Sequence, residues 1–246
     1  MTTSASYLII AATSGIGTAL ARRLALGGAR LVLTGRAQAP VSALAAELDA
    51  VAVVLDATDF EAVDRCAREA AEQLGRLDGV ANCAGSLLLK PAHLTQPADY
   101  AATIAANLTT AFAVTRAAAR VLGDGGGGSI ALVSSAAART GLANHEAIAA
   151  AKAGIIGLTL SAAATYASRQ VRVNCVAPGL VRTPLTARIT SSAAAEAAST
   201  AMHALGRLGD ADDVASALAW LLDPANRWVT GQVLGVDGGL GSVRSR

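Results

Sequence analysis

Aromatic side chains are scarce in this sequence: tryptophan, tyrosine and phenylalanine together make up 3% of its 246 residues. Aliphatic residues must therefore form the core, and 53% of the chain is hydrophobic. Charged residues make up only 15%, with a formal net charge of +2 and no run of one sign. Such a chain lacks the charged surface typical of nucleic-acid or anionic-membrane binding, so we expect a small-molecule substrate instead.

Cysteine is also rare. Cys66, Cys83 and Cys175 lie far apart and lack the spacing of metal ligands, so no metal site is expected. An odd number of cysteines in a chain of this size indicates reduced thiols and a cytoplasmic location. We expect all three to be small buried apolar residues.

Targeting and membrane signals are absent from the pattern as well. Residues 1–17 lack the basic start of a signal peptide. The most apolar later stretch, 147–167, contains Lys152 and several hydroxyl groups. We interpret it as a buried helix and not as a membrane span.

Short apolar runs alternate with segments of helical spacing along the chain. The expected strands are 7–12, 30–34, 52–55, 79–81, 129–134, 171–176 and 232–236, and the expected helices are 17–26, 60–74, 98–122, 146–168 and 211–222. This alternation predicts a parallel sheet covered on both faces. No break in composition divides the chain, so we predict one α/β domain over residues 1–246, with a doubly wound sheet of about seven strands.

Two stretches depart from the alternation. Residues 123–128 are rich in glycine but precede a strand, which indicates a flexible connector and not a phosphate-binding loop. Residues 179–207 are long, rich in Ala, Ser and Thr, and lack a strand pattern. They form either a lid over a pocket or solvent-facing helices without a gating role.

The turn at residues 11–17 is the first candidate site. It follows an expected strand, opens a helix and contains Gly15 and Gly17. Glycine lets the backbone approach a pyrophosphate, and the N–H groups at a helix start face its negative charge. This context is typical of the dinucleotide turn of a Rossmann fold. The contacts expected here involve Ala11, Thr13, Ser14, Ile16 and Gly17.

Arg36 bears on the choice of dinucleotide. It follows the second expected strand, where an acid would hold the ribose 2′-hydroxyl of NAD, and the chain has no acid there. A guanidinium suits the additional 2′-phosphate of NADP(H), so we expect NADPH. A solvated surface arginine is the alternative.

Several motifs resemble the short-chain dehydrogenase/reductase family. Residues 14–17 resemble the second half of its TGxxxGIG motif, with Ala11 at the first glycine, a change that crowds the turn. Residues 82–85 resemble its NNAG stretch, with Cys83 at the second asparagine. The likeness continues through 174–184, 207–214 and 229–239 and so covers nearly the whole chain.

The resemblance implies further cofactor contacts. It assigns Asp56 to the adenine, and residues of the NNAG stretch to the adenosine ribose. Lys152 holds the nicotinamide ribose, and the segment after the sixth strand meets the carboxamide. The residues concerned are Asp56, Asn82, Ala84, Gly85, Lys152, Pro178, Gly179, Val181 and Thr183.

The family's active site combines a serine, a tyrosine thirteen positions later and a lysine four positions after that. The corresponding residues here are Ser135, Ile148 and Lys152. In the family the serine orients the substrate oxygen, the tyrosine protonates it and the lysine lowers the tyrosine pKa. Isoleucine cannot donate a proton. Asn107 resembles the family asparagine that holds a water leading to the lysine, with a structural cap or kink as the alternative.

His145 is a candidate replacement for the tyrosine. It lies three residues before Ile148 and seven before Lys152, so a helix that begins there places all three on one face. Histidine is the most frequent general acid. A solvent-exposed histidine at a helix start is the alternative.

These residues predict an NADPH-dependent oxidoreductase that transfers a hydride to a small carbonyl or imine with a non-standard proton donor. A non-redox dinucleotide-binding protein, or a silent subunit of a hetero-oligomer, is the alternative that Ala11 and Ile148 support; the presence of Ser135 favours redox chemistry. The family pairs its two long helices, here 98–122 and 146–168, with those of a second subunit. We therefore expect a homotetramer or homodimer.

Overall fold

The computed structural model describes residues 4–243, so residues 1–3 and 244–246 of the predicted domain lie outside the described part. The strands are β1 (Ser6–Ile10), β2 (Arg30–Gly35), β3 (Val51–Val54), β4 (Gly79–Asn82), β5 (Gly128–Val133), β6 (Val171–Pro178), β7 (Val181–Arg182), β8 (Gly209–Asp210) and β9 (Val233–Val236). The α-helices are α1 (Gly15–Leu26), α2 (Gln38–Leu48), α3 (Phe60–Leu74), α4 (Pro97–Ile104), α5 (Thr110–Asp124), α6 (Glu146–Tyr166), α7 (Ala193–Ala201) and α8 (Ala211–Leu222). Short 3-10 or π-helical turns are η1 (Ala92–Leu94), η2 (Ala105–Thr109), η3 (Ala136–Ala138), η4 (Ala167–Arg169) and η5 (Pro224–Asn226).

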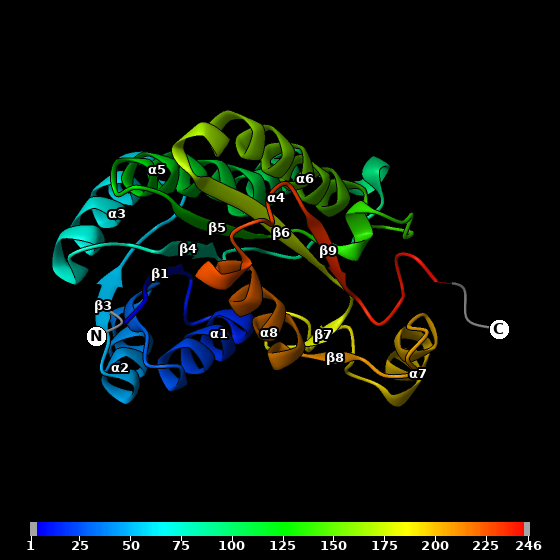
Figure 1. Ribbon diagram of the computed structural model, residues 1–246. Helices are drawn as coiled ribbons and strands as arrows, with labels where there is room; N and C mark the ends of the chain where they lie inside the picture. The colour runs from blue at the N-terminus through cyan, green and yellow to red at the C-terminus, as the bar shows by residue number, and fades with distance from the viewer. Residues whose placement is uncertain (1–3, 244–246) are drawn as a thin grey trace.

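Seven strands form one parallel sheet in the order β3-β2-β1-β4-β5-β6-β9 (Figure 1). The chain winds outward from β1 to β3, returns to the middle at β4 and winds outward again in the opposite direction. This doubly wound arrangement confirms the predicted Rossmann-like α/β domain. The reversal between β1 and β4 opens a crevice at the carboxyl ends of these strands, where open α/β sheets bind ligands.

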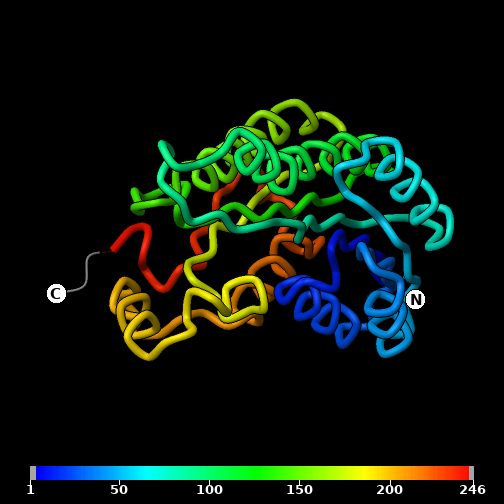
Figure 2. Tube along the Cα trace, turned by 180° about the vertical axis from the view of Figure 1, so that it is seen from behind, coloured from blue at the N-terminus to red at the C-terminus, as the bar shows by residue number. Residues whose placement is uncertain are grey.

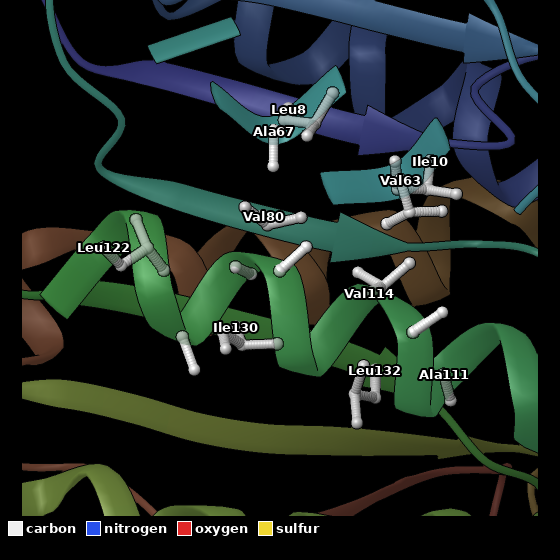
Figure 3. Packing of buried hydrophobic residues seen from close by; sticks show 14 of the residues in the cluster. Leu8, Ile10, Val63, Ala67, Val80, Ala111, Val114, Leu122, Ile130 and Leu132 are labelled. Atoms are coloured by element: carbon white, nitrogen blue, oxygen red, sulfur yellow. The ribbon is translucent and has the colours of Figure 1, made fainter. Parts of the chain in front are cut away.

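Alternation along the strands divides the core into two layers. In β1, Leu8 and Ile10 pack on one face of the sheet, whereas Tyr7 and Ile9 pack on the other, and all four are buried. Successive side chains of a strand point to opposite faces, so a strand covered on both sides must be apolar throughout. Figure 3 shows the first layer, in which α5 lies over β4 and β5 and its side chains at Ala111, Val114 and Leu122 point toward Val80, Ile130 and Leu132.

Helices cover both faces of the sheet. One layer contains α1, α2 and α8, and the other contains α3, α5 and α6 (Figures 1 and 2). Large aromatic side chains are scarce, and small residues fill the core instead by letting neighbouring elements approach closely. A β-carbon added at Gly154 of α6 would lie 2.7 Å from Leu108 Cδ2, so the Leu108 side chain packs directly on the backbone of α6.

Helix α6 and its continuation to Arg169 are long and apolar enough to cross a membrane by composition alone, with a mean hydropathy of 1.6 over the most apolar window. In the fold this helix packs against β6, α4 and α5. Its inner residues Ile155, Thr159 and Ala162 are buried. Packing in the core therefore accounts for the apolar residues on the inner face of this helix.

The structure differs from the sequence-based elements in three places. Helix α2 was not predicted, although Val41, Leu44 and Ala45 form its buried stripe. The helix expected over 98–122 is divided by the π-helical turn η2. The expectation that 179–207 lacks a strand is wrong, because β7 pairs with β8 in a separate two-stranded sheet. Two-residue strands carry too few residues for an alternating pattern.

Candidate active site

One cavity collects most of the predicted site residues. Its volume is about 660 Å³, and residues 13–16, 83–87, 133–137, 178–181 and 183–186 contribute to its wall. These segments follow β1, β4, β5 and β6, so the cavity lies outside the carboxyl ends of four adjacent strands. Its size is within the range of small-molecule and cofactor sites.

The turn after β1 leaves no room for side chains at its glycines. A β-carbon at Gly17 would lie 2.4 Å from the carbonyl oxygen of Ala11, and one at Gly15 would lie 2.7 Å from Thr183 Cγ2. Ser14 caps α1, because its Oγ accepts a hydrogen bond from the Gly17 N–H at 3.1 Å. The turn thus brings bare backbone and the start of α1 to the cavity, the arrangement that binds a pyrophosphate.

Ala11 adopts a backbone conformation that usually requires glycine. Its φ angle is +56°, in the left-handed region. The turn holds it there with two hydrogen bonds: the Ala11 N–H donates to Thr34 Oγ1 at 3.1 Å, and its carbonyl accepts from the Ser14 N–H at 3.0 Å. The methyl group of Ala11 is therefore held under strain, because this conformation is unfavourable for an L-residue.

Arg36 and Asp56 follow the neighbouring strands β2 and β3 and are both exposed. Asp56 Oδ1 accepts hydrogen bonds from the Thr58 N–H and hydroxyl at 2.9 and 2.8 Å. These two bonds lower the pKa of the Asp56 carboxyl, and the positive charge of Arg36 lowers it further. Arg36 and Asp56 thus lie close enough to interact at the outer end of the crevice.

Lys152 reaches the cavity from within α6. Its side chain is buried, and Nζ donates to the carbonyl oxygen of Val133, the last residue of β5, at 2.8 Å. Burial lowers the pKa of Lys152 to about 8. One turn earlier on α6, Ile148 is also buried and lines the same cavity.

The two adjacent serines after β5 have different hydrogen-bonding roles. Ser134 is buried and donates its hydroxyl to the Lys152 carbonyl at 2.8 Å, which ties α6 to the sheet. Ser135 Oγ instead accepts from the Ala137 N–H at 3.1 Å. Because that bond uses a lone pair, the Ser135 hydroxyl hydrogen stays available to an acceptor in the cavity.

Asn107 lies in the π-helical turn η2 and is fully buried. Its Oδ1 accepts from the Ser86 N–H at 3.2 Å, and its Nδ2 donates to Thr103 O at 2.9 Å and to Ser86 Oγ at 3.0 Å. Both polar atoms are therefore satisfied by protein groups. Asn107 does not line the cavity itself, but Ser86 does.

Ser86 is a polar residue of the cavity that the sequence-based analysis missed. It accepts a hydrogen bond from Asn107 and, like Ser135, keeps its hydroxyl hydrogen available. Asn107 and Lys152 both lie close to the neighbouring Gly85: a β-carbon there would be 3.1 Å from Asn107 Oδ1 and 3.5 Å from Lys152 Nζ. A hydroxyl directly after the glycine of the 82–85 stretch was the available signal.

His145 is the residue immediately before α6 and lines the cavity. Its Nδ1 lies 2.7 Å from the Ala143 carbonyl oxygen. Since a carbonyl only accepts, Nδ1 carries a hydrogen, and Nε2 is the ring nitrogen left for a second interaction.

Cys83 differs from the expectation for a buried cysteine. Cys66 and Cys175 are buried as expected, whereas Cys83 is partly exposed and lines the cavity. Desolvation nevertheless raises the pKa of the Cys83 thiol to about 12. The thiol is therefore neutral at physiological pH.

The predicted cofactor-binding residues fall into two groups by position. Those that line the cavity are Thr13, Ser14, Ile16, Ala84, Gly85, Lys152, Pro178, Gly179, Val181 and Thr183. Those that lie behind it or along the crevice are Ala11, Gly17, Arg36, Asp56 and Asn82. Asn82 is buried and shapes the turn after β4, because its Oδ1 accepts from the Ala84 N–H at 3.1 Å.

His203 joins the segment after β7 to the end of the sheet. It is buried just beyond α7, its Nδ1 lies 2.8 Å from Ser199 O, and its Nε2 accepts from the Leu180 N–H at 3.1 Å. The neighbouring Leu205 N–H donates to Gly238 O at 3.0 Å. These hydrogen bonds hold residues 199–205 against Leu180 and Gly238, beside Gly179 at the mouth of the cavity.

Comparison with known proteins gives consistent matches along the chain. A family model described as enoyl-(acyl carrier protein) reductase matches residues 10–241. The chain is 38% identical over 241 residues to a cis-4-hydroxycyclohexanecarboxylate dehydrogenase of Sinomonas cyclohexanicum, covering 96% of both chains. It is 34% identical over 242 residues to the 3-oxoacyl-(acyl-carrier-protein) reductase FabG of Thermotoga maritima, covering 95% of this chain and 96% of the relative.

Solved structures extend the likeness to the backbone. A short-chain type dehydrogenase/reductase from Mycobacterium ulcerans superposes with a TM-score of 0.93 at 32% identity, covering 98% of this chain and 91% of the other. ElxO with NADP bound superposes with a TM-score of 0.91 at 28% identity, covering 98% of this chain and 100% of the other.

Proposed function

Because the chain belongs to the short-chain dehydrogenase/reductase family, we propose that it is an NADPH-dependent oxidoreductase whose substrate is a small carbonyl compound or imine and whose proton donor is not a tyrosine. The observation that carries this proposal is the single cavity in which the dinucleotide-type turn, Ser135 and Lys152 meet. The relatives of the chain reported above are dehydrogenases and reductases of similar length and fold.

The crevice fits a dinucleotide. The missing β-carbons at Gly15 and Gly17 and the start of α1 suit a pyrophosphate, and Arg36 suits the 2′-phosphate that distinguishes NADPH. NADP is also the dinucleotide bound in the ElxO structure. When bound, the cofactor supplies the hydride.

The chain's own residues then orient the substrate. The available hydrogen of the Ser135 hydroxyl donates to the carbonyl oxygen, and the Lys152 ammonium beside it stabilises negative charge that develops there. Preorganised donors of this kind act strongly in a site that excludes water.

By the resemblance of its motifs, Ile148, four residues before Lys152, stands where the family has its tyrosine. An isoleucine supplies neither a proton nor a hydrogen bond. His145 carries a hydrogen on Nδ1 for Ala143 O, so its protonated form presents a second hydrogen on Nε2. We therefore assign the proton donor to His145.

An iminium substrate is the second candidate. It already carries a positive charge, so hydride transfer alone completes its reduction, and the apolar Ile148 does not oppose this. However, a cation beside the Lys152 ammonium is repelled wherever Lys152 is protonated. This repulsion favours the carbonyl at neutral pH.

The cofactor is tested with Arg36→Ala. The variant loses the guanidinium that would pair with the 2′-phosphate, so we expect its Kd for NADPH to rise about 10-fold or more while its Kd for NADH stays nearly unchanged. Fluorescence titration measures both constants. Equal losses for the two cofactors would contradict the assignment of Arg36.

The proton donor is tested with Ile148→Tyr and His145→Ala on a panel of ketones and cyclic imines. If proton delivery by His145 is efficient, His145→Ala abolishes ketone reduction with NADPH binding intact, and Ile148→Tyr adds little. If proton delivery limits the native protein, Ile148→Tyr raises ketone turnover by about 10²–10⁴-fold, the usual contribution of a positioned general acid.

The same panel tests the competing assignments. Turnover of imines that neither substitution improves would assign the iminium as substrate. A folded protein that binds NADPH but reduces nothing, in both native and Ile148→Tyr forms, would support the non-redox function or a silent subunit and overturn the proposal.

A further inference from the structure

The polar and apolar groups of the catalytic cavity come from different parts of the fold. Ser135 lies two residues after the end of β5, and Lys152 donates a hydrogen bond to the last carbonyl of that strand. Loops elsewhere around the cavity contribute mainly large aliphatic side chains. These are Leu87, Leu89, Leu142, Leu185, Ile189 and Met202.

Several of these aliphatic side chains are half exposed. Leu89 is 41% exposed, Leu185 53% and Met202 48%. They come from two parts of the chain, after β4 and between β7 and β8, that both contribute to the wall of this cavity. Large apolar side chains gathered at one concave place indicate a surface that an apolar ligand covers.

The cavity provides little to pair with a charged substrate. None of the described residues that line the cavity is an arginine, an aspartate or a glutamate. The ionisable groups there are Lys152, His145 and Cys83, of which the Cys83 thiol is neutral because burial raises its pKa to about 12. In the proposed reaction the Lys152 ammonium, which is fixed at the end of β5, and the proton donor His145 both act at the reacting group, so a second charged group of a substrate would lie among the leucines.

An unpaired charge in such surroundings is costly, because burial without a partner forfeits its hydration. We propose that the substrate is a bulky, neutral, mainly aliphatic ketone or imine with one polar group, and that Leu185, Ile189 and Met202 determine this specificity. The inference rests on the proposed redox function and adds the substrate class to it.

Two ketones of matched ring size test the class: 4-tert-butylcyclohexanone and 4-oxocyclohexanecarboxylate. We expect kcat/KM with NADPH to favour the neutral ketone by about 100-fold or more, the consequence of leaving a carboxylate unpaired. Equal values, or a preference for the carboxylate, would overturn the proposal.

Substitution of the wall sharpens the test. Leu185→Arg supplies the missing cation, so it should raise kcat/KM for the carboxylate about 10-fold or more and lower that for the neutral ketone. Leu205→Arg is the matched control, because Leu205 is 73% exposed and lines a separate cavity beside His203 and Gly238. A ratio unchanged by Leu185→Arg would place the substrate elsewhere and contradict the assignment of this wall.

Calorimetry distinguishes the substrate class from the redox function. The affinities of both ketones are measured for the native protein and Leu185→Arg, with and without NADPH. Tighter binding of the neutral ketone, reversed by Leu185→Arg, supports the substrate class even if no turnover occurs, and absence of turnover counts against the redox proposal alone. Tighter binding of the carboxylate by the native protein would refute the class.

Discussion

Among the residues that the structure describes, no carboxylate forms an ion pair with the buried Lys152. Its hydrogen-bond partner is the carbonyl oxygen of Val133, which is polar but not charged. Burial therefore favours the neutral amine and lowers the pKa of Lys152 to about 8, from about 10.4 for a free lysine. The anionic phosphates of a dinucleotide would supply part of the missing negative charge.

This shift makes stability depend on pH with a definite sign. Below pH 8 the folded protein must hold a buried ammonium. Between about pH 8 and 10.4 the unfolded chain binds a proton that the folded chain has lost, so the free energy of unfolding rises with pH, by about 3 kcal/mol in total.

Lys152→Met removes this dependence. We expect the difference in unfolding free energy between the cofactor-free variant and the native protein to be largest below pH 8 and to fall by about 3 kcal/mol by pH 10.4. Urea denaturation at several pH values measures it. Lys90→Met, which removes a partly exposed lysine paired with Asp99, is the control for lost positive charge; a parallel response of both variants would disprove the effect.

The site could be predicted from the sequence only where spacing along one element determines it. Ser135 and Lys152 were found through their motif spacing, and His145, Ile148 and Lys152 were placed together by helical periodicity; all four line one cavity. The position of Ser86 directly after Gly85 was a local signal, but its hydrogen bond to Asn107, twenty-one residues away, is encoded by no local pattern.

At the scale of elements, the turn between β1 and α1 combines a tight bend with a residue poorly suited to it. Ala11 holds φ at +56°, a conformation that costs an L-residue about 1–2 kcal/mol. Glycine avoids that cost but gives the unfolded chain more freedom, worth about 0.4–1 kcal/mol.

We therefore expect Ala11→Gly to stabilise the protein by up to about 1 kcal/mol, and to tighten NADPH binding because the turn is less crowded. Thermal or urea denaturation and cofactor titration measure the two effects. Ala12→Gly is the matched control: Ala12 is buried and not among the residues with positive φ, so its variant should lose stability. Destabilisation of both variants to the same extent would refute the strain at Ala11.

The elements that follow the rules of periodicity closely were predicted well. Helices α3 and α8 have the predicted bounds, since each begins at an acidic cap and carries a regular apolar stripe. Helix α2 lacks a side-chain cap and contains Pro40 near its start, which obscured its stripe. The π-helical turn η2 could not be predicted, because it depends on how Asn107 meets Ser86 across the fold.

At the scale of the whole molecule, apolar side chains remain uncovered on the layer of α4, α5 and α6. Tyr100 of α4 is 49% exposed, and Phe112 of α5 and Leu160 of α6 are each 52% exposed. Phe112 also packs against Phe60, with ring centroids 6.1 Å apart. Exposed apolar side chains gathered on one face are typical of an interface.

We propose that these helices pair with a second copy of the chain. Sedimentation velocity at micromolar concentration should then show a dimer or tetramer, and Phe112→Glu should shift it toward the monomer by burying an unpaired charge. Leu26→Glu, at a 90% exposed position of α1 in the opposite layer, should leave the assembly unchanged. A native protein that sediments as a clean monomer would contradict the proposal.

The two hydrogen bonds of His203 have a spectroscopic consequence. Ser199 O requires a hydrogen on Nδ1, and the Leu180 N–H requires a lone pair on Nε2. The tautomer of the His203 ring is therefore determined by how residues 180–203 pack. The chain has three histidines, and His203 is the buried one among them. The ¹⁵N resonances of His203 in the native protein therefore report whether residues 180–203 keep these two hydrogen bonds when a ligand binds.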